Sequence, residues 1–240
     1  MKVVRPNCRW QFTAADSEFI LSALGRQPND TQTLESLFAD PGSRDAILDL
    51  DQVHQAMLES PACLQVSPHL YFYVLVRRAL QRAGLTDRAL ADYTAEVLAE
   101  FTQVARTHAT PDGGPQPFDY FVDLLATLQK CDDRGGFELR AHMGNMALFQ
   151  SGLFRDRIEH RAARKGFPGL SYYEQIGESS FRIASHHPLA NRMGIQAVLR
   201  QLADCFHRLR IVLNDLADRI FSWGIEDAQM QPLLVRIQAG

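Results

Sequence analysis

The C-terminal third of the chain carries a hydrophobic pattern that is typical of a long buried helix. Eight large apolar residues recur at alternating intervals of four and three positions: Ile195, Leu199, Leu202, Phe206, Leu209, Leu213, Leu216 and Ile220. Such a seam follows one side of an α-helix. Positions beside the seam, such as Val198 and Ala203, are also apolar. The width of the stripe predicts a helix from about residue 194 to residue 223, buried in a bundle and ended by Gly224.

The opposite face of this predicted helix is polar. It carries four residues of metal-ligand type, namely Asp204, His207, Asp215 and Asp218. Because they lie away from the apolar seam, we interpret them as a solvated face and not as a metal site. Ile211 is an apolar residue on that face. If exposed, it would be a contact point for a partner.

Helix start signals followed by helical spacing of apolar residues occur about nine times along the chain. Thr13 with Asp16 predicts one start, and Gly25 the end of that helix. Further starts are predicted at Asp30, at Ser43, at Ser67-Pro68 and at Thr86, and a capping box is predicted at Ser171 with Glu174. The short stretches Val3–Val4 and Cys8–Phe12 are the strand candidates, too little for a sheet.

These patterns predict an all-α fold, a multi-helix bundle of about nine helices in two lobes with the long C-terminal helix in its core. Residues 107–117, THATPDGGPQP, are rich in proline and glycine and are expected to form a linker. The N-terminal helical lobe would then span residues 1–106 and the C-terminal helical lobe residues 118–240. We expect the two lobes to pack as one compact unit.

Composition narrows the class of protein. The chain has 240 residues, a net charge of −3, 46% hydrophobic and 22% charged residues, which is ordinary for a globular protein. No apolar run reaches the ~18 residues of a membrane span, and the N-terminus lacks the apolar stretch of a signal peptide. A cytoplasmic protein without membrane contact is therefore expected. The four cysteines are widely spaced, and no zinc, P-loop, GxGxxG, HExxH or GxSxG pattern is present, so we expect no cofactor and no metal.

The segment Gly135–Phe149 is apolar around most of its helical circumference, which predicts that some polar feature is buried. Glu138, His142 and Asn145 share one stripe, and Arg140 points nearly the opposite way. If the stripe faces water, Arg140 enters a groove lined by glycine and alanine and needs a carboxylate, carbonyls or a bound anion. If the stripe faces inward, Glu138 and His142 can act as ligands or as an acid/base pair. An exposed Glu138–His142 pair with a structural salt bridge at Arg140 is the third interpretation.

A second helix, from Ser171 to His187, would form the other wall of such a pocket. We expect Tyr173, Ile176, Ile183 and His187 to lie on its inner face, with His187 as either a core or a capping residue before Pro188. The stripe of Glu174, Glu178, Arg182 and His186 is expected to be solvated. The candidate ligand-binding residues are Glu138, Arg140, His142, Asn145, Tyr173 and His187.

Two groups of basic residues form a candidate patch for an acidic partner or nucleic acid. One group is Arg77, Arg78 and Arg82; the other is Arg155, Arg157, Arg161, Arg164 and Lys165. No aromatic residues alternate with these arginines, so stacking on single strands is not indicated.

The leading hypothesis is a non-enzymatic α-helical binding protein, such as an adaptor, a regulator or an assembly component, that acts through helix surfaces on a protein partner or on itself. The alternatives are a helical-bundle enzyme or a small-molecule or anion-binding protein with a pocket around Arg140, and nucleic-acid binding through the arginine groups.

Overall fold

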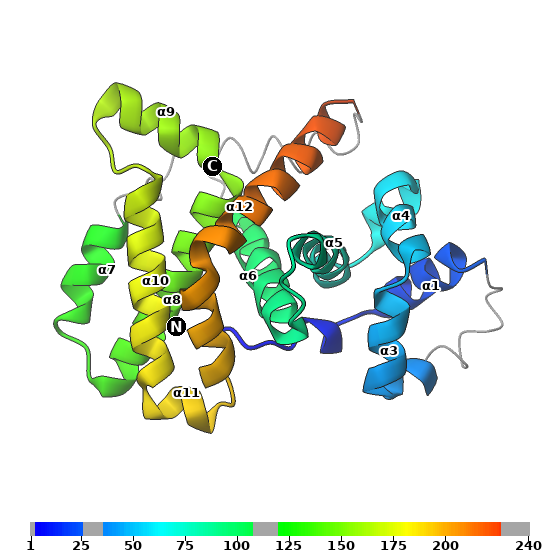
Figure 1. Ribbon diagram of the computed structural model, residues 1–240, viewed down its shortest axis with the longest axis horizontal. Coiled ribbons are helices and arrows are strands. Elements are labelled where there is room, and N and C mark those ends of the chain that lie inside the picture. The colour runs from blue at the N-terminus through cyan, green and yellow to red at the C-terminus, as the bar shows by residue number, and fades with distance from the viewer. Residues whose placement is uncertain (1–2, 26–35, 108–119, 227–240) are drawn as a thin grey trace. The chain divides into compact units, whose positions relative to one another are not determined.

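The computed structural model describes residues 3–25, 36–107 and 120–226. These ranges form helices joined by turns and contain no strand, so the predicted all-α class is confirmed (Figure 1). None of the helices within these ranges is long and apolar enough to cross a membrane. The chain divides into two compact units, Pro6–Ala99 and Met1–Arg5 with Glu100–Gly240. The boundary lies inside a helix, before the linker predicted at 107–117; residues 108–117 of that linker lie outside the described residues.

The Pro6–Ala99 unit is built around an apolar helix. Its elements are the 3-10 helix η1 (Cys8–Trp10), α1 (Ala14–Ala23), α3 (Pro41–Leu48), α4 (Asp51–Glu59), the 3-10 helix η3 (Pro61–Gln65), α5 (Pro68–Arg82) and the first part of α6 (Arg88–Thr107). Leu70, Tyr73 and Val76 of α5 are completely buried. Ser67 caps this helix and Pro68 occupies its first turn, as predicted, because proline lacks the N–H that the first turn leaves unbonded.

The predicted start of α1 is also confirmed. The Thr13 hydroxyl accepts from the N–H of Asp16, and the Asp16 carboxylate accepts from the N–H of Thr13, which completes a capping box. The second Asp16 oxygen accepts from the Ser67 N–H at 2.6 Å and so joins α1 to the start of α5. After α1, Gly25 has φ of +66°, a backbone conformation that favours glycine.

Three predictions in this unit need correction or lie outside the description. The start predicted at Ser43 implied one helix through Ile47, Leu50 and Met57, but this segment is two helices, because the extended backbone at Leu50 separates α3 from α4. Asp40 caps α3, and the Ser43 N–H donates to that cap. Within the strand candidate Cys8–Phe12, residues 8–10 form the 3-10 helix η1. Most of the helix predicted from Asp30 lies in residues 30–35, outside the described residues.

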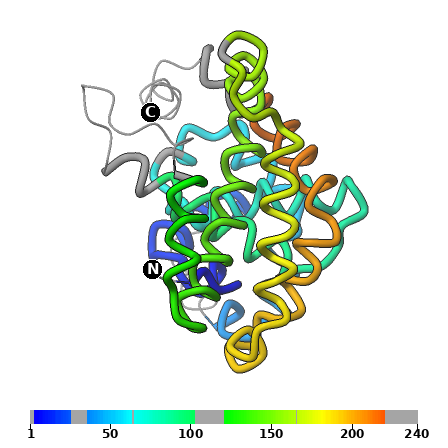
Figure 2. The backbone as a smooth tube through the Cα atoms, turned by 90° about the vertical axis from the view of Figure 1, so that its left-hand side faces the viewer, coloured from blue at the N-terminus to red at the C-terminus, as the bar shows by residue number. Residues whose placement is uncertain are grey.

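The other unit, Met1–Arg5 with Glu100–Gly240, has three mutually packed helices as its core. Its helices are the end of α6, α7 (Tyr120–Leu128), α8 (Asp133–Leu153), α9 (Arg155–Lys165), α10 (Leu170–His186), α11 (Pro188–Arg192) and α12 (Gln196–Glu226). Helices α8, α10 and α12 lie side by side and contact one another, and α7 packs against α8 (Figure 2). Helices α9 and α11 lie at opposite ends of α10 (Figure 1).

Glycines allow the three core helices to approach closely. A Cβ atom on Gly144 of α8 would lie 2.6 Å from the Phe181 ring of α10. A Cβ on Gly177 of α10 would lie 2.2 Å from the Phe206 ring of α12 and 3.1 Å from the Ala147 Cβ of α8. Both aromatic rings are buried. The rings of one helix therefore fill the space that a missing side chain leaves on the next.

The predicted seam of α12 is confirmed over the residues whose side chains are described. From Ile195 to Leu216 every member of the seam is buried. The side chain of Ile220 lies outside the described part. The predicted stop is wrong, because α12 continues through Gly224 to Glu226.

Two predictions for α10 are wrong. Gly169 occupies the N-cap position and no side chain caps the helix, so Ser171 and Glu174 form no capping box. Ile183 is 50% exposed and does not lie on the inner face. That face is formed by small and aromatic residues, Tyr173, Gly177, Ser180, Phe181, Ala184 and Ser185.

Candidate functional site

The polar stripe of α8 turns from solvent toward the interior along its length. Glu138 forms an ion pair with Arg134 at 2.9 Å, and this hydrogen bond lowers the pKa of the Glu138 carboxyl. His142, one turn later, stacks on the Phe101 ring with centroids 5.7 Å apart, and burial lowers the pKa of its imidazole. Asn145 is buried. The contacts described for Glu138 and His142 are therefore with different neighbours, Arg134 and Phe101.

Arg140 does not form the buried salt bridge that was one expectation for it. Its side chain is half-buried, and it makes no ion pair or hydrogen bond with any described residue. Burial lowers the pKa of its guanidinium. The groove expected along this face is filled one turn later, where the Phe181 ring covers Gly144.

His187 caps the short helix α11. Its Nδ1 accepts from the Leu189 N–H at 3.1 Å, which places the proton of the neutral ring on Nε2. Nε2 lies 3.0 Å from a carboxylate oxygen of Asp133, and the ring stacks on Phe137 at 5.0 Å. His187 therefore joins the beginnings of α8 and α11, and the structure does not bring it together with Arg140 or His142.

Three of the predicted residues do come together where α9 meets α10. Arg157 and Arg161 lie one turn apart on α9, and both side chains are half-buried. Tyr173, at the start of α10, is 1% exposed and lies within electrostatic range of both guanidinium groups. The Arg161 guanidinium stacks on the Phe167 ring at 4.3 Å, which fixes its plane. We call Arg157, Arg161 and Tyr173 the α9–α10 cluster.

The α9–α10 cluster concentrates positive charge in a partly desolvated place. Burial lowers the pKa of Arg157, and the positive charge of Arg161 lowers it further. Burial also raises the pKa of the Tyr173 hydroxyl. Guanidinium groups are the side chains whose paired N–H donors match the oxygens of a phosphate or carboxylate.

The other basic residues of α9 are placed differently. Arg155 pairs with Asp156 at 3.2 Å and with Asp218 of α12 at 3.4 Å. Arg164 is exposed, and the Lys165 side chain lies outside the described part. The outer face of α9 also carries Asp156 and Glu159, so it is of mixed charge and not a continuous basic surface.

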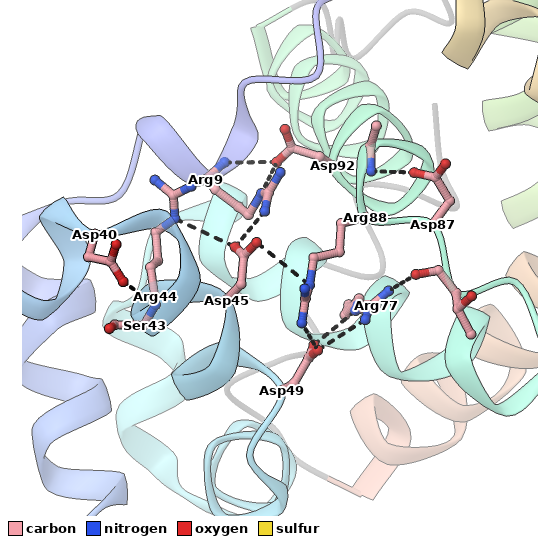
Figure 3. Close-up of polar contacts among 12 residues, drawn as sticks. Arg9, Asp40, Ser43, Arg44, Asp45, Asp49, Arg77, Asp87, Arg88 and Asp92 are labelled. Carbon is pink, nitrogen blue, oxygen red and sulfur yellow. Dashed lines mark hydrogen bonds and ion pairs between the residues drawn. The ribbon is translucent and has the colours of Figure 1, made fainter.

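The first basic group is divided between interior and surface. Arg77 is buried, donates to both oxygens of Asp49 at 2.9 and 3.0 Å, and donates to the Thr86 carbonyl at 2.6 Å (Figure 3). Arg78 is partly exposed and pairs with Asp51, whereas Arg82 is exposed. Arg77 is thus held inside its unit by a carboxylate and cannot contribute to a surface patch.

Arg77 belongs to a larger set of buried and partly buried ion pairs that the sequence did not reveal. The Arg9 backbone N–H and Nε both donate to Asp92, and the Arg9 guanidinium also pairs with Asp45 (Figure 3). Arg88 bonds Asp49 at 2.7 Å. Burial raises the pKa of the Asp92 carboxyl above its ordinary value, even though the charge and hydrogen bonds of Arg9 act to lower that pKa. These contacts join η1, α3, α5 and α6.

A second polar network, also missed, crosses the three core helices. The Glu174 carboxylate of α10 accepts hydrogen bonds from Arg210 and, at 2.7 Å, from His207 of α12. Arg210 also donates to Asn214 at 2.6 Å, and the Asn214 amide donates to the Ser151 and Gly152 carbonyls of α8 at 2.7 Å each. The available signal was the spacing of Arg210 and Asn214, one turn apart beside an apolar seam.

No family model, curated protein or solved structure matches this chain.

Proposed function

We propose that this chain is a non-enzymatic α-helical binding protein that recognises an anionic group, a phosphate or a carboxylate, on a protein partner through the α9–α10 cluster. The observation that carries the proposal is the placement of two half-buried guanidinium groups one turn apart beside a buried tyrosine. Like charges brought together in partly desolvated surroundings attract an anion more strongly than exposed arginines do.

The geometry favours a small anionic group over a nucleic-acid backbone. A phosphate backbone is bound by several cations spread along an accessible surface. On α9 the basic side chains alternate with carboxylates, and Arg77 is buried within the other unit. A single phosphate or carboxylate needs only the two guanidinium forks of Arg157 and Arg161.

Calorimetric titration with matched peptides tests the proposal. One short peptide carries a phosphoserine, the second a glutamate and the third a serine at the same position. We expect the first two to bind and the serine peptide not to bind, because its hydroxyl carries no charge to match the guanidinium groups. Binding should weaken as salt is added, since ions screen partly exposed charges.

Substitutions on α9 distinguish binding at the α9–α10 cluster from binding at the exposed surface of the helix. Arg161→Gln should weaken binding of the phosphoserine peptide by about tenfold or more, the worth of a charge-assisted hydrogen bond of about 1.5–3 kcal/mol. The matched control is Arg164→Gln, an exposed arginine on the same helix, which should leave the affinity nearly unchanged. Equal effects of the two substitutions, or equal binding of all three peptides, would refute anion recognition at this cluster.

A further inference from the structure

His207 lies on the surface of α12 with a fixed proton and an accessible lone pair. Its side chain is 65% exposed, and its Nδ1 lies 2.7 Å from a Glu174 oxygen. An ionised carboxylate can only accept a hydrogen bond, so Nδ1 carries the proton of the neutral ring. Nε2 then holds the lone pair, and no described residue hydrogen-bonds to it.

Buried residues of α12 hold the Glu174 carboxylate in place. Arg210, 9% exposed, donates to the same oxygen, and Asn214, 3% exposed, anchors Arg210 to the α8 backbone. Burial raises the pKa of the Glu174 carboxyl, but the hydrogen bonds from Arg210 and His207 lower it by more. The net pKa is below the ordinary value, so the carboxylate stays ionised. A carboxylate that orients an imidazole and balances the positive charge gained during attack is the arrangement that activates histidine in many enzymes.

We propose that Nε2 of His207 is a phosphoryl acceptor, modified by an acyl phosphate. The Nε2 lone pair attacks phosphorus, the bond from phosphorus to the acyl oxygen breaks, and the carboxylate product leaves with that electron pair. No proton has to move. The proton on Nδ1 stays between the ring and Glu174, and the positive charge that the ring gains lies beside this carboxylate.

A phosphoryl group suits this place better than an acyl group. Acyl transfer requires hydrogen-bond donors aimed at an oxyanion. Phosphoryl transfer from an activated donor passes through a loose transition state with little covalent chemistry for the protein to do, and it requires a nucleophile in line and stabilisation of the charge on the phosphoryl oxygens. Asp204, one turn away on α12, pairs with Arg182 at 2.9 Å, and Arg182 also pairs with Glu178 at 3.1 Å.

The surrounding surface fits a donor carried by a protein. Ile211, one turn beyond His207 on the same face of α12, is 41% exposed. An exposed apolar side chain beside a reactive imidazole gives a partner a contact that water does not satisfy.

Another exposed histidine provides a matched comparison. The Nδ1 of His186 lies 2.7 Å from the Arg182 carbonyl, so its proton is also on Nδ1, but its partner is a neutral carbonyl and not a carboxylate. The two imidazoles therefore share the same tautomer and differ in the charge behind the ring. Any difference in their reactivity reports on Glu174.

The experiment treats the full chain with acetyl phosphate and follows each histidine by mass spectrometry at neutral pH, where phosphohistidine survives. We expect His207 to gain a phosphoryl group about tenfold faster than His186 or more, and Glu174→Gln to remove that difference. His207→Gln should abolish the faster modification. Equal rates at His207 and His186 in the unaltered protein would overturn the proposal, and so would an undiminished rate in a folded Glu174→Gln variant.

Discussion

Replacing Gly144 with alanine is expected to destabilise the protein, although alanine is the better helix former. The new Cβ would lie 2.6 Å from Cε1 of Phe181, and two further ring carbons lie within 2.9 Å. Carbon atoms normally stay about 3.5–4.0 Å apart, so the fully buried ring must move by roughly 1 Å. Overpacking of this kind costs up to about 3 kcal/mol, and the gain in helix propensity returns about 1 kcal/mol. The expected net loss is about 2 kcal/mol.

Gly136 of the same helix provides the control. Nothing lies within 4 Å of a Cβ built there, so Gly136→Ala should stabilise the protein by about 0.5–1 kcal/mol. Urea titration followed by circular dichroism should separate the two unfolding midpoints by roughly 1 M or more. If Gly144→Ala is as stable as Gly136→Ala, the close packing of α8 against α10 is wrong.

Three further predictions concern stability. Leu209→Ala should cost about 2–5 kcal/mol by opening a core cavity, and a cost below about 1 kcal/mol in urea titration would contradict its burial in α12. Arg77→Ala should cost about 1.5–3 kcal/mol, because Asp49 loses two hydrogen bonds and keeps the one from Arg88, and calorimetric unfolding should recover part of this loss in the double variant Arg77→Ala/Asp49→Ala. The His142 pKa is lower in the folded chain, so the unfolded chain binds more protons below about pH 6.5, and stability should fall as pH drops through that range. His142→Phe should flatten this part of the pH profile; an unchanged slope would show that the imidazole titrates alike in both states.

The regular parts of the fold were predictable because they depend on local spacing. The seam from Ile195 to Leu216 shows its burial through periodicity alone. The Thr13–Asp16 capping box needs only neighbours in the sequence. Such features do not depend on which helices lie next to one another.

The wrong predictions concern features that depend on which residues of other helices lie nearby. Ser171 and Glu174 have capping-box spacing, but the Glu174 carboxylate instead meets Arg210 of α12. Ile183 was expected inside because it is large and apolar, yet Gly177 and Ala184 lie on the buried face, where small residues allow close packing. Hydrophobicity alone cannot show which face of a helix its neighbours will cover.

The candidate site was predictable in its members but not in their grouping. Arg157 and Arg161 were recognised as basic residues and Tyr173 as a pocket residue, in separate hypotheses. Only the packing of α9 on the start of α10 brings them together. The hydrogen bonds of the buried Arg77 likewise depend on a tertiary contact, because their acceptor Asp49 lies at the end of α3 and Arg77 lies on α5.

Nuclear magnetic resonance of the arginine Nε–Hε groups tests the central claim, anion recognition by the α9–α10 cluster, most directly. On titration with the phosphoserine peptide, the Arg157 and Arg161 signals should shift and saturate together, because guanidinium N–H groups respond to a bound anion. The signal of Arg164, exposed on the same helix, should stay in place. Saturable peptide binding that leaves Arg157 and Arg161 unmoved would contradict the account.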